Sequence, residues 1–157
     1  MIEQVPGDTP EERLAQLGLE LPPPPAPIAA YVPFTYSGEL IVTSGVLPMR
    51  EGKVIRGRLG ADLTVEAGAE AARTCALSLL ALLAAAAGKL DRITGLLLLT
   101  GYVNSAPDFA RHSEVVDGAS HLLRQVLGEK GHHARVAVGV AELPREACLE
   151  LQLIAKR

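Results

Sequence analysis

Alternating apolar and polar positions near the end of the chain predict its best-defined strands. In residues 134–141, valines alternate with Arg135 and with small residues, and in residues 147–155 every second position is Ala or Leu. Such alternation indicates β-strands, and the Pro-containing break between the two runs indicates a hairpin. We therefore expect a hairpin with one apolar face for the core. On its other face, Arg135 and Glu150 would lie nearly opposite each other.

Three stretches carry helical patterns with recognisable ends. Residues 9–19 begin with a Thr cap and two glutamates, and residues 64–87 begin at Thr64 and stop before Gly88. From Leu77 onward the second helix is apolar nearly all round, which is typical of a helix buried on most sides. Residues 105–108 resemble a capping box that starts a third helix, which would end at Gly128.

The remaining patterns predict strands before and between these helices. We expect strands at residues 28–34 and 39–46, with a turn at residues 36–38, and a strand at residues 92–103. Four consecutive leucines in the last of these indicate burial on both faces, for which a subunit interface would provide the second cover. The element order β-β-α-β-α-β-β predicts an α+β sandwich with helices on one face of the sheet.

Length, composition and charge limit the class of protein. A chain of 157 residues forms one core, and a net charge of −3 with scarce aromatics does not favour a nucleic-acid surface. Residues 1–26 would form an N-terminal helix and a proline-rich linker ahead of a domain at residues 27–157. The N-terminal residues do not have the basic and apolar pattern of a signal segment, and residues 77–87 are too short to span a bilayer, so we expect a cytoplasmic protein without membrane contact.

The facing pair Arg135 and Glu150 has two interpretations. It can be a cross-strand ion pair on a solvated face, which is the more common arrangement and a weak one. Alternatively it is a site, because an arginine among small residues can hold a carboxylate with two parallel hydrogen bonds and a glutamate can transfer a proton.

At these residues the sequence resembles the Rid family, also called YjgF-like. The stretch HARVAVGVAELP followed by CLELQLIA carries the Arg, Leu-Pro and Glu of the family's C-terminal signature. A second block, from Tyr31 to Gly45, resembles the N-terminal hairpin of the family. The resemblance covers residues 27–155, and it implies a chorismate-mutase-like fold assembled as a homotrimer around a central β-barrel, with ligand clefts between subunits.

The resemblance also implies roles for single residues. Arg135 and Glu150 would be the catalytic pair. The residues expected to bind substrate are Tyr31, Gly45, Ser113 and Ala137. Ser113 stands near the position where the family often has a cleft Asn. The paired histidines before Ala134 and the stretch VDGASHLL point to a longer, less studied branch with an extra N-terminal helix.

The implied activity is hydrolytic deamination of reactive 2-imino or 2-enamino acids to 2-oxo acids and ammonia, without a cofactor. Two alternatives remain open at this stage: a binding protein that holds a small carboxylate without turnover, and an endoribonuclease that inhibits translation, the older label of the family. We expect no metal site, because the adjacent His132 and His133 point to opposite faces of a strand. Cys75 and Cys148 lack metal-ligand spacing and are expected to be reduced core thiols.

Overall fold

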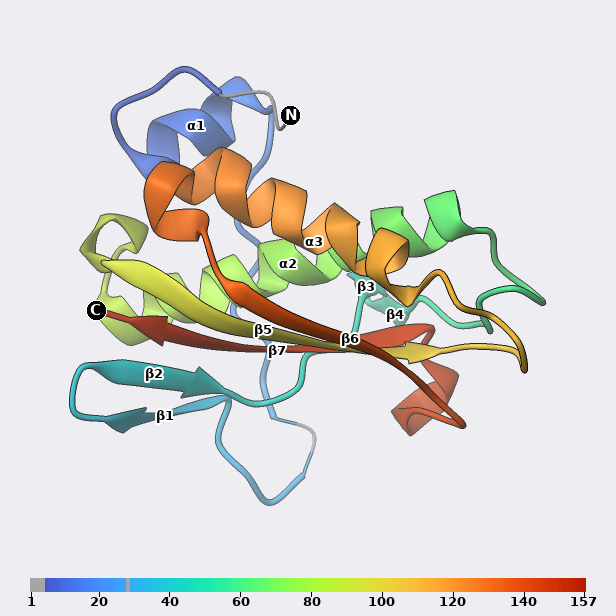
Figure 1. Cartoon of the computed structure of the whole chain (residues 1–157). Coiled ribbons are helices and arrows are strands. Elements are labelled where there is room, and N and C mark those ends of the chain that lie inside the picture. Colours follow the sequence, from blue (N-terminus) through green and yellow to red (C-terminus); the bar gives the residue numbers. More distant parts are fainter. Residues whose placement is uncertain (1–4, 28) are drawn as a thin grey trace.

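The computed structural model describes residues 5–27 and 29–157, which fold into helices packed on one face of a mixed sheet (Figure 1). The helices are α1 (Pro10–Gln16), α2 (Val65–Ala87) and α3 (His112–Leu127), with short 3-10 turns η1 (Leu90–Arg92), η2 (Gly128–Gly131) and η3 (Pro144–Glu146). The strands are β1 (Phe34–Ser37), β2 (Leu40–Thr43), β3 (Met49–Arg50), β4 (Lys53–Val54), β5 (Gly95–Asn104), β6 (Ala134–Val140) and β7 (Leu149–Lys156). The predicted α+β sandwich and its element order are confirmed.

The predicted N-terminal caps of α1 and α2 are confirmed, and that of α3 is not. Thr64 caps α2 by accepting a hydrogen bond from the backbone N of Ala67, and Gly88 ends it in the left-handed conformation with φ 86°. Thr9 and Glu12 form a capping box on α1. The prediction for α3 was wrong at its start, because Asp108 adopts φ 66° and turns the chain, so the helix begins only at His112.

Helix α2 lies at the centre of the core. By length and composition alone its 23 residues could cross a membrane, but 61% of the most apolar window is buried inside the fold. It packs against α3 and against the buried leucines of β7. The close approach of α2 and α3 requires Gly118, since a Cβ there would overlap the backbone of Ala69. The apolar character of α2 is therefore explained by burial in protein.

The predicted hairpin between β6 and β7 is wrong. The sheet order is β1-β2-β7-β5-β6, so β5 lies between the two strands. Strand β5 pairs in parallel with β6 and antiparallel with β7. Helix α3 makes the crossover from β5 to β6, as parallel neighbours require, and η3 then carries the chain back past β5. Alternation correctly predicted both strands but not which strand pairs with which.

The N-terminal hairpin is shifted from its predicted position. Strand β1 comprises Phe34–Ser37 instead of residues 28–34, of which Ile28 lies outside the described residues. The turn is formed by Gly38 and Glu39, with Gly38 at φ 58°, a conformation that glycine adopts without strain. Strand β2 ends at Thr43, so Gly45 lies in the loop after the strand.

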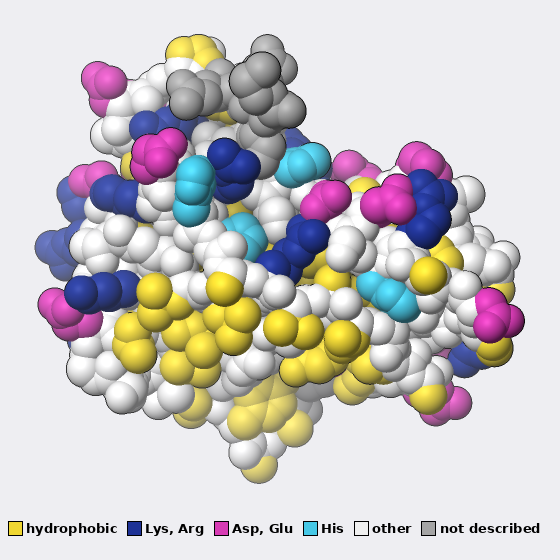
Figure 2. All heavy atoms as spheres, in the orientation of Figure 1, with side chains coloured by type: hydrophobic (Ala, Val, Ile, Leu, Met, Phe, Trp, Pro, Cys, Tyr) yellow, Lys and Arg dark blue, Asp and Glu magenta, His cyan; other side chains and the backbone are white. Residues whose placement is uncertain are grey.

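The sheet face opposite the helices is apolar and uncovered. Leu97, Val136 and Val138 are among its exposed large side chains. Figure 2 shows hydrophobic atoms gathered in a band over the sheet, beneath a row of Arg and His side chains. Of the leucine run, Leu96 and Leu99 are buried and Leu97 is 43% exposed, so the protomer by itself covers one face of β5.

Candidate functional site

Three of the predicted site residues line one pocket. Tyr31, Gly45 and Glu150 surround a cavity of about 410 Å³ between the N-terminal loops and strand β7. Ser44, Leu47 and Pro144 are further residues of its wall. This pocket lies on the sheet face away from the helices, because Glu150 alternates along β7 with the buried Leu149 and Leu151.

Gly45 and Glu150 approach each other so closely that position 45 has no room for a side chain. A Cβ on Gly45 would overlap Oε1 of Glu150 and lie 2.7 Å from its Cδ. The backbone at Gly45 therefore forms a wall beside the carboxylate. Burial raises the pKa of Glu150 above its usual range, because the charged form loses solvation there. A carboxylate with a raised pKa is a stronger base than an ordinary one, which suits it to receive and return a proton.

Arg135 belongs to a different cluster, between β6 and α3. Its Nη1 donates hydrogen bonds to Asp117 Oδ1 at 2.6 Å and to Ser120 Oγ at 3.1 Å. Both bonds use the same nitrogen. The edge formed by Nε and Nη2 makes no hydrogen bond to any residue that the structure describes, and it is the edge on which a ligand carboxylate could bind with two bonds.

His133 extends this cluster through Ser120. Its Nδ1 lies 2.7 Å from the carbonyl oxygen of Gly131, so Nδ1 carries the proton and donates. Its Nε2 therefore accepts from Ser120 Oγ at 3.0 Å, and that hydroxyl accepts from Arg135. Burial, together with the nearby positive charges of Arg135 and Arg124, lowers the pKa of His133. A neutral His133 thus orients the hydroxyl that holds Arg135.

The other two predicted residues lie on the same side of the protomer as Arg135. Ala137 shares the helix-facing side of β6 with Arg135 and packs half-buried against the core. Ser113 is exposed in the first turn of α3, one helical turn before Asp117. Arg135, Ala137 and Ser113 form what we call the α3–β6 half-site, and Tyr31, Gly45 and Glu150 form the β7 half-site.

The two half-sites lie on opposite faces of the sheet within one protomer. Arg135 pairs with Leu99, which pairs on its other side with Leu153, and both leucines are fully buried beneath the helices. Glu150 pairs with Tyr102 on the uncovered face. The predicted opposition of Arg135 and Glu150 across a ladder is therefore wrong, and the cross-strand ion pair does not form. The carboxylate partner of Arg135 is Asp117 instead.

Sequence reasoning missed Asp117, Ser120 and His133 as neighbours of Arg135. Two signals were present. Asp117 and Ser120 are three residues apart on α3 and so share a face, and His133 and Arg135 are two residues apart on an extended segment and share a side. Only the packing of α3 across β6 brings the two pairs together.

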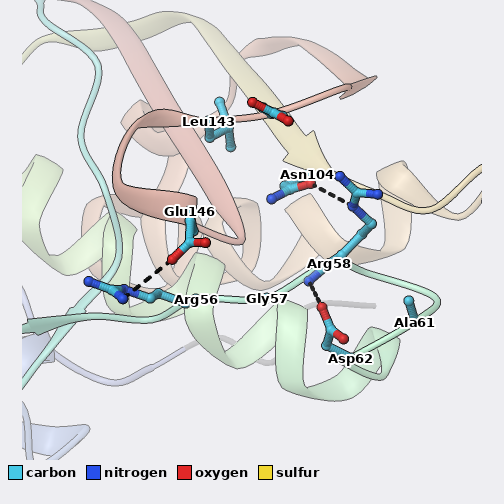
Figure 3. A pocket seen from close by; sticks show the side chains of 9 residues that line it. Arg56, Gly57, Arg58, Ala61, Asp62, Asn104, Leu143 and Glu146 are labelled. Carbon is cyan, nitrogen blue, oxygen red and sulfur yellow. Dashed lines mark hydrogen bonds and ion pairs between the residues drawn. The ribbon is translucent and has the colours of Figure 1, made fainter.

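A larger polar pocket lies where β5 and β6 end, beside Asn104 and the segment that follows β6 (Figure 3). It has a volume of about 530 Å³, and its arginines already have protein partners. Arg56 pairs with Glu146 at 3.4 Å, and the Nε of Arg58 lies 3.4 Å from the Oδ1 of Asn104. The backbone N of Arg58 donates to Asp62, and its Nη2 donates to a backbone carbonyl. These contacts fix the loop after β4, and we assign the pocket a structural role.

The side-chain groupings and burial among residues 5–27 and 29–157 bear on two further kinds of site, a metal centre and a reactive thiol. No group of three or more His, Cys, Asp or Glu side chains there could hold a metal ion. Cys75 and Cys148 are buried free thiols. Burial raises the pKa of Cys75 strongly and that of Cys148 to about 11, so both stay protonated and unreactive.

The chain resembles a known protein family and proteins that belong to known organisms. The model of the family described as "YjgF/chorismate_mutase-like, putative endoribonuclease" matches residues 11–156. Protein TCP17 of Trypanosoma cruzi is 44% identical over 145 residues, which cover 91% of each chain.

Solved structures agree with this match. Protein Atu1372 of Agrobacterium tumefaciens, whose function is described as unknown, is 44% identical with a TM-score of 0.86, and the match covers 95% of this chain and 92% of that one. A "putative endoribonuclease" from Shewanella oneidensis is 37% identical with a TM-score of 0.93, over 96% and 100% of the two chains.

The fold extends to more distant structures. E. coli TdcF with bound serine is 23% identical, with a TM-score of 0.59 over 85% of this chain and 91% of that one, a likeness of fold alone. The match along residues 11–156 and the relatives at 44% identity show that the chain belongs to the YjgF/chorismate-mutase-like family.

Proposed function

We propose that the protein hydrolyses reactive 2-imino or 2-enamino acids to 2-oxo acids and ammonia, in a cleft that two subunits of a homotrimer form together. The observation that carries the proposal is the division of the site. A single protomer presents an arginine with an open edge on one face of the sheet and a proton-accepting glutamate on the other. The two halves can meet only between copies.

The proposed chemistry assigns one task to each half-site. The open edge of Arg135 holds the carboxylate of the substrate with two hydrogen bonds. Glu150 takes a proton from a water molecule as that water attacks the imine carbon, and passes it to the imine nitrogen to give a carbinolamine. Glu150 then takes the proton of the carbinolamine hydroxyl and passes it to the same nitrogen. The carbon–nitrogen bond breaks, ammonia leaves, and the oxygen of the water becomes the oxygen of the 2-oxo acid. The raised pKa of Glu150 supports this role.

Two further observations support a small acid as ligand. The β7 half-site is a pocket of ligand size lined by Tyr31 and the bare backbone of Gly45. E. coli TdcF holds serine on a related fold. The label endoribonuclease is not favoured, because the chain carries a net charge of −3 and few aromatic side chains on which bases could stack. We place the reaction in the cytoplasm.

Mixing two inactive variants tests the shared cleft directly. Arg135→Ala and Glu150→Gln each remove one half of every site in a homotrimer. If each site takes Arg135 from one subunit and Glu150 from its neighbour, random mixed trimers recover activity at about a quarter of their sites. Ammonia release from freshly generated 2-iminopropanoate measures the recovery.

The outcomes separate the possibilities clearly. A site confined to one subunit gives no recovery on mixing, because no subunit then carries both residues. Wild-type protein that releases no ammonia, and binds neither pyruvate nor 2-oxobutanoate, overturns the proposed function. Binding of these acids without ammonia release favours a protein that holds small carboxylates.

A further inference from the structure

A second cavity, also lined mainly by apolar atoms, adjoins the Glu150 pocket, with Glu51 and Arg145 as the charged residues of its wall. Its volume is about 500 Å³. Apolar side chains of its wall come from the proline-rich segment, from the loop after β2 and from α2, among them Pro22, Pro23, Val46 and Leu77. The proline-rich segment thus forms one side of this cavity.

The two cavities share a wall. Tyr31, Gly45 and Leu47 line both of them. A ligand whose reactive carbon lies beside Glu150 is therefore next to the second cavity. The polar group of Thr74 does not compete for the ligand, because its hydroxyl donates to the carbonyl oxygen of Glu70 in its own helix at 3.0 Å.

We propose that this cavity binds the hydrocarbon side chain of the substrate, so that the favoured substrates are 2-imino acids with long or branched apolar side chains. The inference rests on the proposed function for the position of the reactive carbon. The methyl group of 2-iminopropanoate would leave most of the apolar wall in contact with water. Each additional methylene moved from water into such a cavity raises affinity about fourfold, which corresponds to about 0.8 kcal/mol.

A chain-length series of product acids tests the inference. Wild-type protein is titrated by calorimetry with straight-chain 2-oxo acids from pyruvate to 2-oxooctanoate, and Kd is expected to fall about fourfold per methylene until the cavity is full. Thr74→Phe places a ring in the cavity and should flatten this dependence. Ala85→Phe adds the same ring at an exposed position of α2 outside the cavity, and should keep the wild-type slope.

The result can separate the inference from the function on which it rests. A flat series in wild type, or an unchanged slope in Thr74→Phe, overturns the inference even if 2-iminopropanoate is deaminated. A steep series that only Thr74→Phe flattens supports it, even if no ammonia is released and the proposed deamination fails. If Thr74→Phe does not fold, Thr74→Leu replaces it. Failure of every acid to bind overturns the inference.

Discussion

The backbone of Gly45 lies against the carboxylate of Glu150, with the space for a Cβ at position 45 already filled by that carboxylate. This contact joins the loop after β2 to the middle of β7 and sets where the carboxyl group points. A single methyl group added at position 45 would therefore disturb the site.

Gly45→Ala should therefore displace the carboxylate of Glu150 and strongly lower ammonia release. Because the displaced atoms are the end of a flexible side chain, the cost in unfolding free energy should stay below about 1 kcal/mol. Urea unfolding measures the stability, and the ammonia assay measures the effect on the site. Ammonia release at the wild-type rate in Gly45→Ala would contradict the contact.

Glu150→Gln should raise stability at neutral pH. Because the pKa of Glu150 is raised on folding, its contribution to stability is full below the pKa of the unfolded chain and is lost as the pH rises through the folded pKa. Glutamine carries no such loss. We expect the melting temperature of the variant to exceed that of wild type by a few degrees at pH 7, and the difference to shrink toward pH 4.

The hydrogen-bond chain through His133 predicts a second pH dependence, of opposite sign. The pKa of His133 is lowered on folding, so its contribution is present above the unfolded value of about 6.5 and is lost as the pH falls toward the folded value. Ser120, Arg124, His132 and Arg135 are the polar groups that surround it.

His133→Asn should reduce the loss of stability between pH 7 and pH 5, as measured by thermal melts in a series of buffers. His132→Asn is the matched control, because the neighbouring side chain is 52% exposed and should leave the slope nearly unchanged. Identical slopes for wild type and His133→Asn would contradict the neutral, Ser120-orienting imidazole.

The uncovered face of the sheet predicts self-association. Wild-type protein should sediment as a trimer at micromolar concentration, and Val138→Lys, which places a charge on that face, should sediment as a monomer. Ala85→Lys, at an exposed position of α2, should remain trimeric. A monomeric wild type in analytical ultracentrifugation would remove the shared cleft as well.

The core prediction concerns β7. Leu151 is fully buried, and Leu151→Ala should cost about 2–5 kcal/mol of unfolding free energy. Lys53→Ala, at an exposed position of β4, should cost less than about 0.5 kcal/mol. A melt unchanged within error for Leu151→Ala would mean that β7 presents its other face to the helices.

Local patterns predicted the elements well because local physics determines them. The Thr64 cap, the Gly88 stop and the buried leucines of β7 depend on near neighbours in sequence. Which strand pairs with β6 depends instead on where α3 and η3 lead the chain. The alternation of apolar and polar residues within a strand does not predict this.

The site shows the same division. The residue types at Arg135 and Glu150 were visible in the sequence. Their placement on opposite faces follows from the register of both strands on β5, where Arg135 pairs with Leu99 and Glu150 pairs with Tyr102. For Asp117 and His133 the sequence showed only their spacing from Ser120 and Arg135. It did not predict the contacts that join them to Arg135.

The position of β7 has a consequence for how the chain folds. It is the last strand along the described sequence, yet it lies in the middle of the sheet, between β2 and β5. Until it arrives, the β1–β2 hairpin has no neighbour in the sheet and β5 keeps one open edge. The pairing of β2 with β7 joins segments more than a hundred residues apart in the sequence. Because such distant segments meet slowly, we expect the sheet to be completed late in folding and in one cooperative step.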